Sequence, residues 1–136
     1  MWEAPADLFA YGTLLYPDVV NVLLGRVPDH LPAAAAGWRV AVVPDRVYPA
    51  LVAGGSTASG QLLCGLSQDE WAVIDAFEDD LYDLRRLRLV GGGDGWAYVG
   101  DATTVSAENW DRRAFAERHL ANYVERCRTW RRTYGP

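Results

Sequence analysis

One stretch near the start of the chain, residues 8–15, constrains the fold more than any other. It opens with the apolar run Leu8-Phe9-Ala10-Tyr11, which is typical of a short buried strand. The run breaks at Gly12, where a backbone can adopt a positive φ or approach a ligand closely. Successive N–H groups in such a turn form a concave site for one anion. The stretch therefore predicts a strand that leads into an anion-binding loop over Tyr11, Gly12, Thr13 and Leu14.

Short strands are predicted along much of the remaining chain, because apolar runs alternate with breaks rich in Gly and Pro. The Gly- and Ser-rich segment 54–60 predicts a flexible hairpin loop, and segment 26–36 predicts a second loop. Pro49 lies inside one of the runs and indicates an edge strand or a bulge. We expect strands at residues 8–11, 37–43, 47–52, 61–65, 85–90 and 96–99.

Helical signals are found in three parts of the sequence. The clearest is a capping box, in which Ser67 and Glu70 can each accept a hydrogen bond from the other residue's backbone N–H. Short strands combined with a few helices indicate a single α+β domain over residues 1–136, built on a small mixed β-barrel or curved sheet. The helices are expected over residues 17–24, 68–81 and about 111–132.

The charge of the chain argues against two kinds of partner. The net charge is −5, and the one basic run, residues 126–132, is short, so no nucleic-acid partner is expected. No apolar run approaches the roughly 18 residues of a membrane span, and no basic-then-apolar leader is present. These features favour a cytoplasmic protein with no membrane partner.

The reactive residue types also exclude several chemistries. Cys64 and Cys127 match no metal or redox spacing, which indicates free thiols. His, Cys and carboxylate residues form no cluster with ligand spacing, so no metal site is expected. The sequence lacks both a Gly-x-Ser-x-Gly and a Gly-x-Gly-x-x-Gly motif, which disfavours a serine hydrolase and a nucleotide-binding protein.

Glu78 is the carboxylate with the most unusual predicted position. On the predicted helix it falls within the apolar stripe that contains Trp71, Ile74 and Leu81. Burial of a carboxylate raises its pKa toward neutrality unless a neighbour pairs with it, and general acid–base catalysis requires such a group. Glu78 is therefore a candidate acid/base, or else a hydrated or salt-bridged residue. The candidate salt-bridge partners are Arg85, Arg86 and Arg88.

The loop and Glu78 together resemble the gamma-glutamylcyclotransferase-like family, also called the AIG2-like family. The run from Leu8 to Leu14 looks like the Tyr-Gly-Ser/Thr-Leu loop of that family. The resemblance is tightest from Leu66 to Glu78 and covers about residues 7–100 in the right order. The other similar segments are residues 48–52, 60–65, 82 and 97–99.

The resemblance implies a gamma-glutamylcyclotransferase-like fold, in which helices flank a small mixed barrel and a cavity lies over the loop. It implies that Glu78 is the general acid/base of a reaction that cyclises a γ-glutamyl group to 5-oxoproline and releases an amine or amino acid. The partner would be a small-molecule γ-glutamyl substrate, with no metal and no cofactor. The substrate-binding residues implied are Tyr11, Gly12, Thr13, Leu14, Tyr48, Pro49, Tyr82 and Tyr98.

Several alternatives stay open at the level of sequence. The same fold could serve as a non-catalytic module that binds a small metabolite or a protein. The loop could hold the substrate's α-carboxylate or stabilise the oxyanion of the reaction. The family's Tyr-x-Arg pattern is displaced by one residue here, so a role for Arg85 is an open question. The leaving group and the choice between monomer and homodimer are also open.

Overall fold

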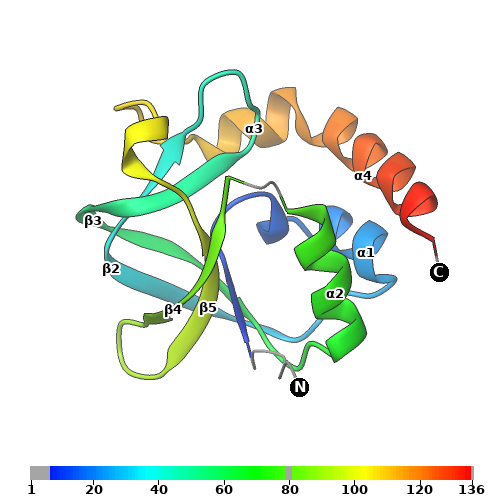
Figure 1. Ribbon diagram of the computed structural model, residues 1–136, viewed down its shortest axis with the longest axis horizontal. Coiled ribbons are helices and arrows are strands. Elements are labelled where there is room, and N and C mark those ends of the chain that lie inside the picture. Colours follow the sequence, from blue (N-terminus) through cyan, green and yellow to red (C-terminus); the bar gives the residue numbers. More distant parts are fainter. Residues whose placement is uncertain (1–6, 79–80, 136) are drawn as a thin grey trace.

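A computed structural model describes residues 7–78 and 81–135 and shows an α+β fold, with a curved sheet beside a group of helices (Figure 1). The predicted fold class is confirmed. The strands are β1 (Leu8–Ala10), β2 (His30–Val42), β3 (Pro49–Leu63), β4 (Asp83–Arg88) and β5 (Asp94–Val99). The helices are α1 (Pro17–Leu24), α2 (Gln68–Phe77), α3 (Arg112–Arg118) and α4 (Leu120–Tyr134), with 3-10 turns η1 (Thr13–Leu15) and η2 (Ala102–Thr104).

The sheet has the order β2-β3-β1-β5-β4, so the short strand β1 lies at its centre. β1 pairs with β3 in antiparallel and with β5 in parallel orientation. β3 also reaches β5 directly, where Leu51 pairs with Val99. Because β3 crosses beyond the end of β1 in this way, the sheet curves strongly, but it remains unclosed and does not form a barrel.

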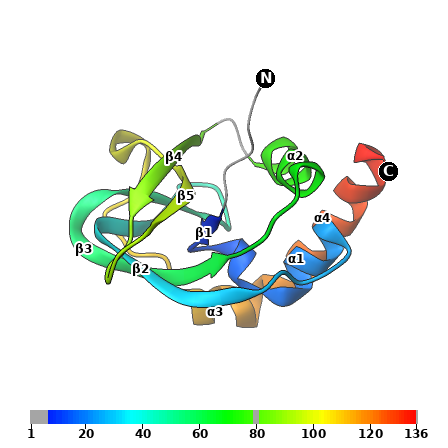
Figure 2. The same cartoon turned by 90° about the horizontal axis from the view of Figure 1, so that it is seen from below.

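The two longest strands form one antiparallel hairpin, and this corrects the two predicted loops (Figure 2). Segment 54–60 lies entirely within β3, and most of segment 26–36 lies within β2. The pairing runs from His30 opposite Leu63 to Val42 opposite Pro49 and includes Ala33 opposite Gly60. Each strand supplies hydrogen-bond partners for the other's backbone, and this pairing outweighs the low strand propensity of Gly and Ser.

The helix α2 starts at its predicted capping box but ends earlier than predicted. Both hydrogen bonds of the box are present, with Ser67 Oγ accepting from the Glu70 N–H at 3.1 Å. The helix ends at Phe77, and Glu78 follows in an extended conformation with ψ of 145°. Residues 79 and 80 of the predicted helix lie outside the described residues. Leu81 is 39% exposed, so it is not on a buried helix face as predicted; the chain leaves α2 here to reach β4.

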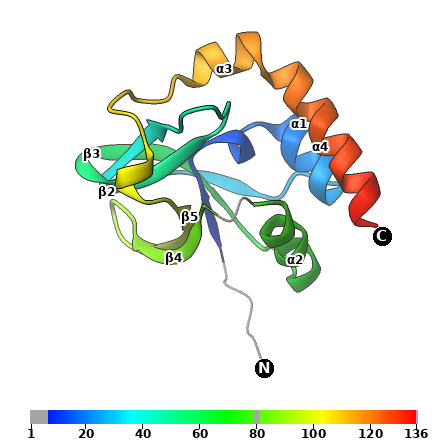
Figure 3. The same cartoon turned by 45° about the horizontal axis from the view of Figure 1, so that its top comes forward.

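The C-terminal segment forms two helices where the sequence predicted one. The break occurs at His119, whose φ of −126° is not helical, although its N–H still bonds to the Phe115 carbonyl at 2.8 Å. Figure 3 shows that α3 and α4 meet at an angle and wrap around the outside of the molecule. The bend allows Phe115 on α3 and both Tyr123 and Cys127 on α4 to be buried in the same core.

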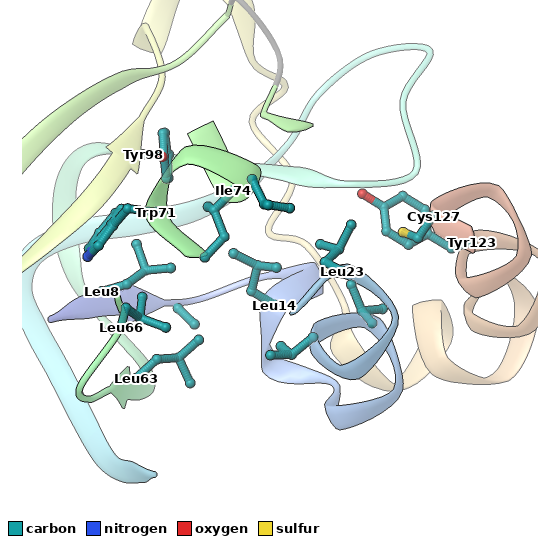
Figure 4. Close-up of a cluster of buried hydrophobic side chains, with 14 of the residues drawn as sticks. Leu8, Leu14, Leu23, Leu63, Leu66, Trp71, Ile74, Tyr98, Tyr123 and Cys127 are labelled. Carbon is teal, nitrogen blue, oxygen red and sulfur yellow. The ribbon is translucent and has the colours of Figure 1, made fainter. Parts of the chain in front are cut away.

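The main core lies between β1, α1, α2 and α4 (Figure 4). Leu8 and Leu14 flank the predicted loop and are 1% and 7% exposed, so the loop is anchored by buried side chains on both sides. Leu23, Trp71 and Ile74 cover them from α1 and α2. In the described ranges, no helix is both long and apolar enough to cross a membrane.

Candidate active site

A cavity of about 190 Å³ lies where the end of β1, the end of α2 and one face of α4 meet. Its walls include every residue that the family resemblance implied for the site, although these come from five separate parts of the chain. The structure thus brings the predicted residues together, and their individual roles stay predictions. Those residues are Tyr11, Gly12, Thr13, Leu14, Tyr48, Pro49, Glu78, Tyr82 and Tyr98.

The sequence offered two reasons for a glycine at position 12, a positive φ or a close approach of the backbone to another group. Its φ is −132°, so the first alternative, a positive φ, does not apply. A Cβ atom here would lie only 2.8 Å from Cγ of Pro49, so the glycine is needed for close packing of the loop against β3. The 3-10 turn η1 follows, and the first N–H groups of a helical turn have no partner inside that turn. The N–H groups of Thr13 and Leu14 are therefore suited to bind an anion.

Three tyrosine hydroxyls hold the walls of the cavity together. The Tyr11 hydroxyl donates to the Tyr98 carbonyl at 2.6 Å, which fixes the loop to β5. The Tyr82 hydroxyl donates to the Pro49 carbonyl at 2.5 Å, which fixes the start of β4 to β3. The Tyr98 hydroxyl donates to Oδ1 of Asp75 on α2 at 3.1 Å. These protons are already used within the protein, which makes the tyrosines parts of a rigid frame.

Glu78 is the one carboxylate among the described residues that line the cavity. Burial, first of all, raises the pKa of four surrounding tyrosines, and the negative charge of Glu78 raises each pKa further. Near neutral pH these phenols keep their protons and cannot act as bases. The four tyrosines are Tyr11, Tyr82, Tyr98 and Tyr123.

One alternative to a catalytic role for Glu78 was a salt bridge to an arginine of β4. Arg86 instead approaches Asp94, with 3.9 Å between Nε and Oδ2. Arg85 is exposed on β4 and is absent from the set of described residues around the cavity. The sequence argument placed Glu78 on a helix face, which is wrong, because Glu78 reaches the cavity from the position that follows α2.

One wall of the cavity was missed from the sequence. It consists of Tyr123, Arg126 and Trp130, which we call the helix wall, and Phe77 of α2 lies beside it. The spacing i, i+3, i+7 puts the three residues on one face of α4. The amphipathic pattern of the C-terminal helix includes Tyr123. Arg126 belongs to the basic run 126–132, which the sequence argument considered only as a possible nucleic-acid contact. The hydroxyl of Thr13 donates to the Tyr123 hydroxyl at 3.4 Å and so connects this wall to the loop.

Possible metal ligands and thiols lie apart from one another in the described part of the chain. Over residues 7–78 and 81–135, no three His, Cys, Asp or Glu side chains gather closely enough to hold a metal ion. Both cysteines are free thiols. Burial raises the pKa of the Cys127 thiol to about 12, so this group is protonated near neutral pH.

Related sequences match most of this chain. A family profile described as "Gamma-glutamyl cyclotransferase, AIG2-like" matches residues 8–114. "AIG2-like protein D" of Arabidopsis thaliana is 36% identical over 128 residues, which cover 88% of this chain and 84% of that protein. "AIG2-like protein C" of the same plant is 40% identical over 89 residues, or 65% of this chain, and the match spans only 52% of that relative.

Solved structures share the fold at lower sequence identity. The solution structure of an Arabidopsis thaliana protein is similar with a TM-score of 0.69 and 23% identity, covering 99% of this chain and 87% of that one. A crystal structure of a Pyrococcus horikoshii protein has a TM-score of 0.62 and 16% identity, with coverage of 87% and 96%. The family match over residues 8–114, together with these relatives, shows that the chain belongs to the AIG2-like gamma-glutamyl cyclotransferase family.

Proposed function

We propose that this protein is a γ-glutamyl cyclotransferase in which Glu78 moves the protons. In this reaction the α-amine of a γ-glutamyl group attacks its own γ-carbonyl carbon. A new C–N bond closes the ring of 5-oxoproline, and the C–N bond to the amine or amino acid that leaves is broken. The observation that carries the proposal is that Glu78 is the one carboxylate among the described residues lining the cavity, and membership of the family supports it.

The proton transfers define the work of Glu78. The substrate's α-amine is an ammonium at neutral pH and must lose a proton before it can attack. Glu78 accepts that proton and later donates it to the leaving nitrogen, so the carboxylate returns to its starting state. The attacking nitrogen loses a second proton as the lactam N–H forms, and the released amine takes up this proton and leaves as an ammonium. General acid–base catalysis of this kind contributes about 10²- to 10⁴-fold in rate. The neighbouring tyrosines cannot replace it, because their raised pKa values keep them protonated.

The loop at residues 11–14 supplies the second part of the proposed mechanism. Backbone N–H groups held in a fixed geometry stabilise a negative oxygen without reorganisation during the reaction. The negative oxygen is either the tetrahedral oxyanion or the substrate's α-carboxylate. The amine and the carbonyl belong to one molecule. Holding the substrate in a folded conformation therefore lowers the activation free energy by several kcal/mol, on the order of the effects measured for intramolecular reactions.

The test is release of 5-oxoproline from a panel of γ-glutamyl amino acids and γ-glutamyl amines. We expect Glu78→Gln to lower kcat by about 100-fold or more, because an amide cannot accept the proton. Glu117→Gln is the matched control, since Glu117 carries the same isosteric change on the exposed side of α3, away from the cavity. It should retain wild-type activity.

Two results would contradict the proposal. Equal turnover by wild type and Glu78→Gln would remove Glu78 from the mechanism. Absence of 5-oxoproline across the whole panel would favour a non-catalytic binding module, and calorimetric binding of the same compounds would then measure what the cavity recognises.

A further inference from the structure

The helix wall carries a positive charge that the proposed mechanism does not use. Arg126 lines the cavity and is exposed, with its guanidinium carbon 5.8 Å from the centre of the Tyr123 ring. Contact with the face of an aromatic ring favours a cation and restricts its position. Within the described part of the chain, Arg126 has no ion-pair partner, whereas Arg128 on the same helix lies 3.3 Å from Glu125.

The described lining of the cavity contains one carboxylate, Glu78 after α2, and one guanidinium, Arg126 on α4. Burial is the main cause of the raised pKa of Tyr123; Glu78 raises that pKa further, and Arg126 lowers it. The pKa of the Cys127 thiol is also raised by burial, lowered by Arg126 and raised by Glu78. Both charged groups thus act on the same two residues of α4. A ligand in the cavity is therefore offered both an acidic and a basic side chain.

The depth of the two walls indicates which part of a substrate each one meets. Tyr11, Gly12, Thr13 and Leu14 are all buried, whereas Arg126 is exposed at the outer rim. The γ-glutamyl half has to lie within the cavity, because its amine must reach Glu78 and its oxygens must reach the loop. The leaving group then extends outward along the helix wall, toward Arg126.

We infer that Arg126 binds a carboxylate on the leaving group, so that the preferred substrates are γ-glutamyl amino acids or peptides with a free carboxylate. This inference rests on the proposed function for its orientation of the substrate. A guanidinium bonds a carboxylate through two parallel N–H groups, and such charge-assisted bonds are stronger than those to a neutral amide. Neutral γ-glutamyl amines lack this group and are poorer substrates.

The experiment compares two probes that differ only in charge, γ-glutamyl-alanine and γ-glutamyl-alanine amide. Wild-type protein should show a kcat/KM for the acid about tenfold or more above that for the amide. Arg126→Gln should raise KM for the acid by about the same factor and leave the amide unchanged, which removes the preference. Arg126→Lys should restore part of it, because the charge is retained and the paired geometry is lost.

Arg128→Gln is the matched control, because Arg128 lies on the same helix and does not line this cavity. It should keep the wild-type preference. If Arg126→Gln lowered kcat/KM equally for the acid and the amide, the inference would be overturned, because Arg126 would then act on the γ-glutamyl half that both probes share. An unchanged preference in that variant would overturn it as well.

A binding measurement separates this inference from the proposed function. Calorimetric titration of the same two probes needs no turnover, so it reads the carboxylate site even if no 5-oxoproline forms. If wild type binds the acid more tightly than the amide and Arg126→Gln does not, the carboxylate site is supported whether or not the protein turns the probes over. Equal binding of the two probes, or binding of neither, overturns it.

Discussion

The two main walls of the cavity differ in how they are built. The loop wall, residues 8–14, is buried and continuous with the core through Leu8, Ala10 and Leu14. The helix wall consists of Tyr123, Arg126 and Trp130, of which Tyr123 is buried, Arg126 is exposed and Trp130 is half-buried. The family match over residues 8–114 includes the whole loop wall and ends before α4 begins.

This difference suggests a division of work between the walls. A wall built into the core keeps its geometry, which a reacting group and an oxyanion site require. A wall on an outer helix tolerates changes of side chain with little cost to the core, which suits recognition of a variable leaving group. We therefore expect substitutions in the loop wall to affect stability and catalysis together, and substitutions in the helix wall to affect mainly KM.

The largest expected effect is at Gly60, which supports the loop wall from β3. A Cβ atom at this position would lie 2.1 Å from the carbonyl oxygen of Ala10, so backbone atoms would have to move. Gly60→Ala should lower the free energy of unfolding by about 3 kcal/mol or more, as severe overpacking does. Urea unfolding measures this. Gly55→Ala is the control, because Gly55 lies on the same strand with no atom within 4 Å of the added Cβ.

A smaller effect is expected at Gly12, where the obstacle is a side chain. Gly12→Ala brings its Cβ to 2.8 Å from Cγ of Pro49 and should cost about 1–3 kcal/mol of stability together with a loss of turnover. In a Pro49→Ala background the obstructing atoms are gone, so the same change should cost about 1 kcal/mol less. A strictly additive double mutant would show that contact with Pro49 is not the reason for glycine.

The smallest expected effect is at Trp130, in the helix wall. Trp130 is half-buried and its ring centre lies 5.0 Å from that of Phe77. Trp130→Leu should cost about 1 kcal/mol of stability and raise KM by about three- to tenfold, with kcat almost unchanged, since only uniform binding is lost. Trp38→Leu is the control, because Trp38 is also half-buried but lies on β2, away from the cavity. A large fall in kcat for Trp130→Leu would contradict the expectation that substitutions in the helix wall affect mainly KM.

The parts of the fold that were predicted correctly depend on neighbours along the chain. The strand before Gly12 and the helix that starts at Ser67 were both recognisable, because an apolar run and a capping box are local signals. The predicted loop at 54–60 was wrong because its Gly and Ser residues form a strand only when β2 supplies the partner backbone. The end of α2 at Phe77 was also missed, since periodicity continues past a helix end.

The sequence by itself determined the α+β class, and with a family resemblance it nominated the loop at residues 11–14 and Glu78 as candidates, because these follow from short segments. Only the tertiary structure decided that Glu78 reaches the cavity from the end of a helix, and that α4 closes the other side. The bond between Thr13 and Tyr123 joins residues 110 positions apart. A contact over that separation depends on how the whole chain packs, and no local pattern encodes it.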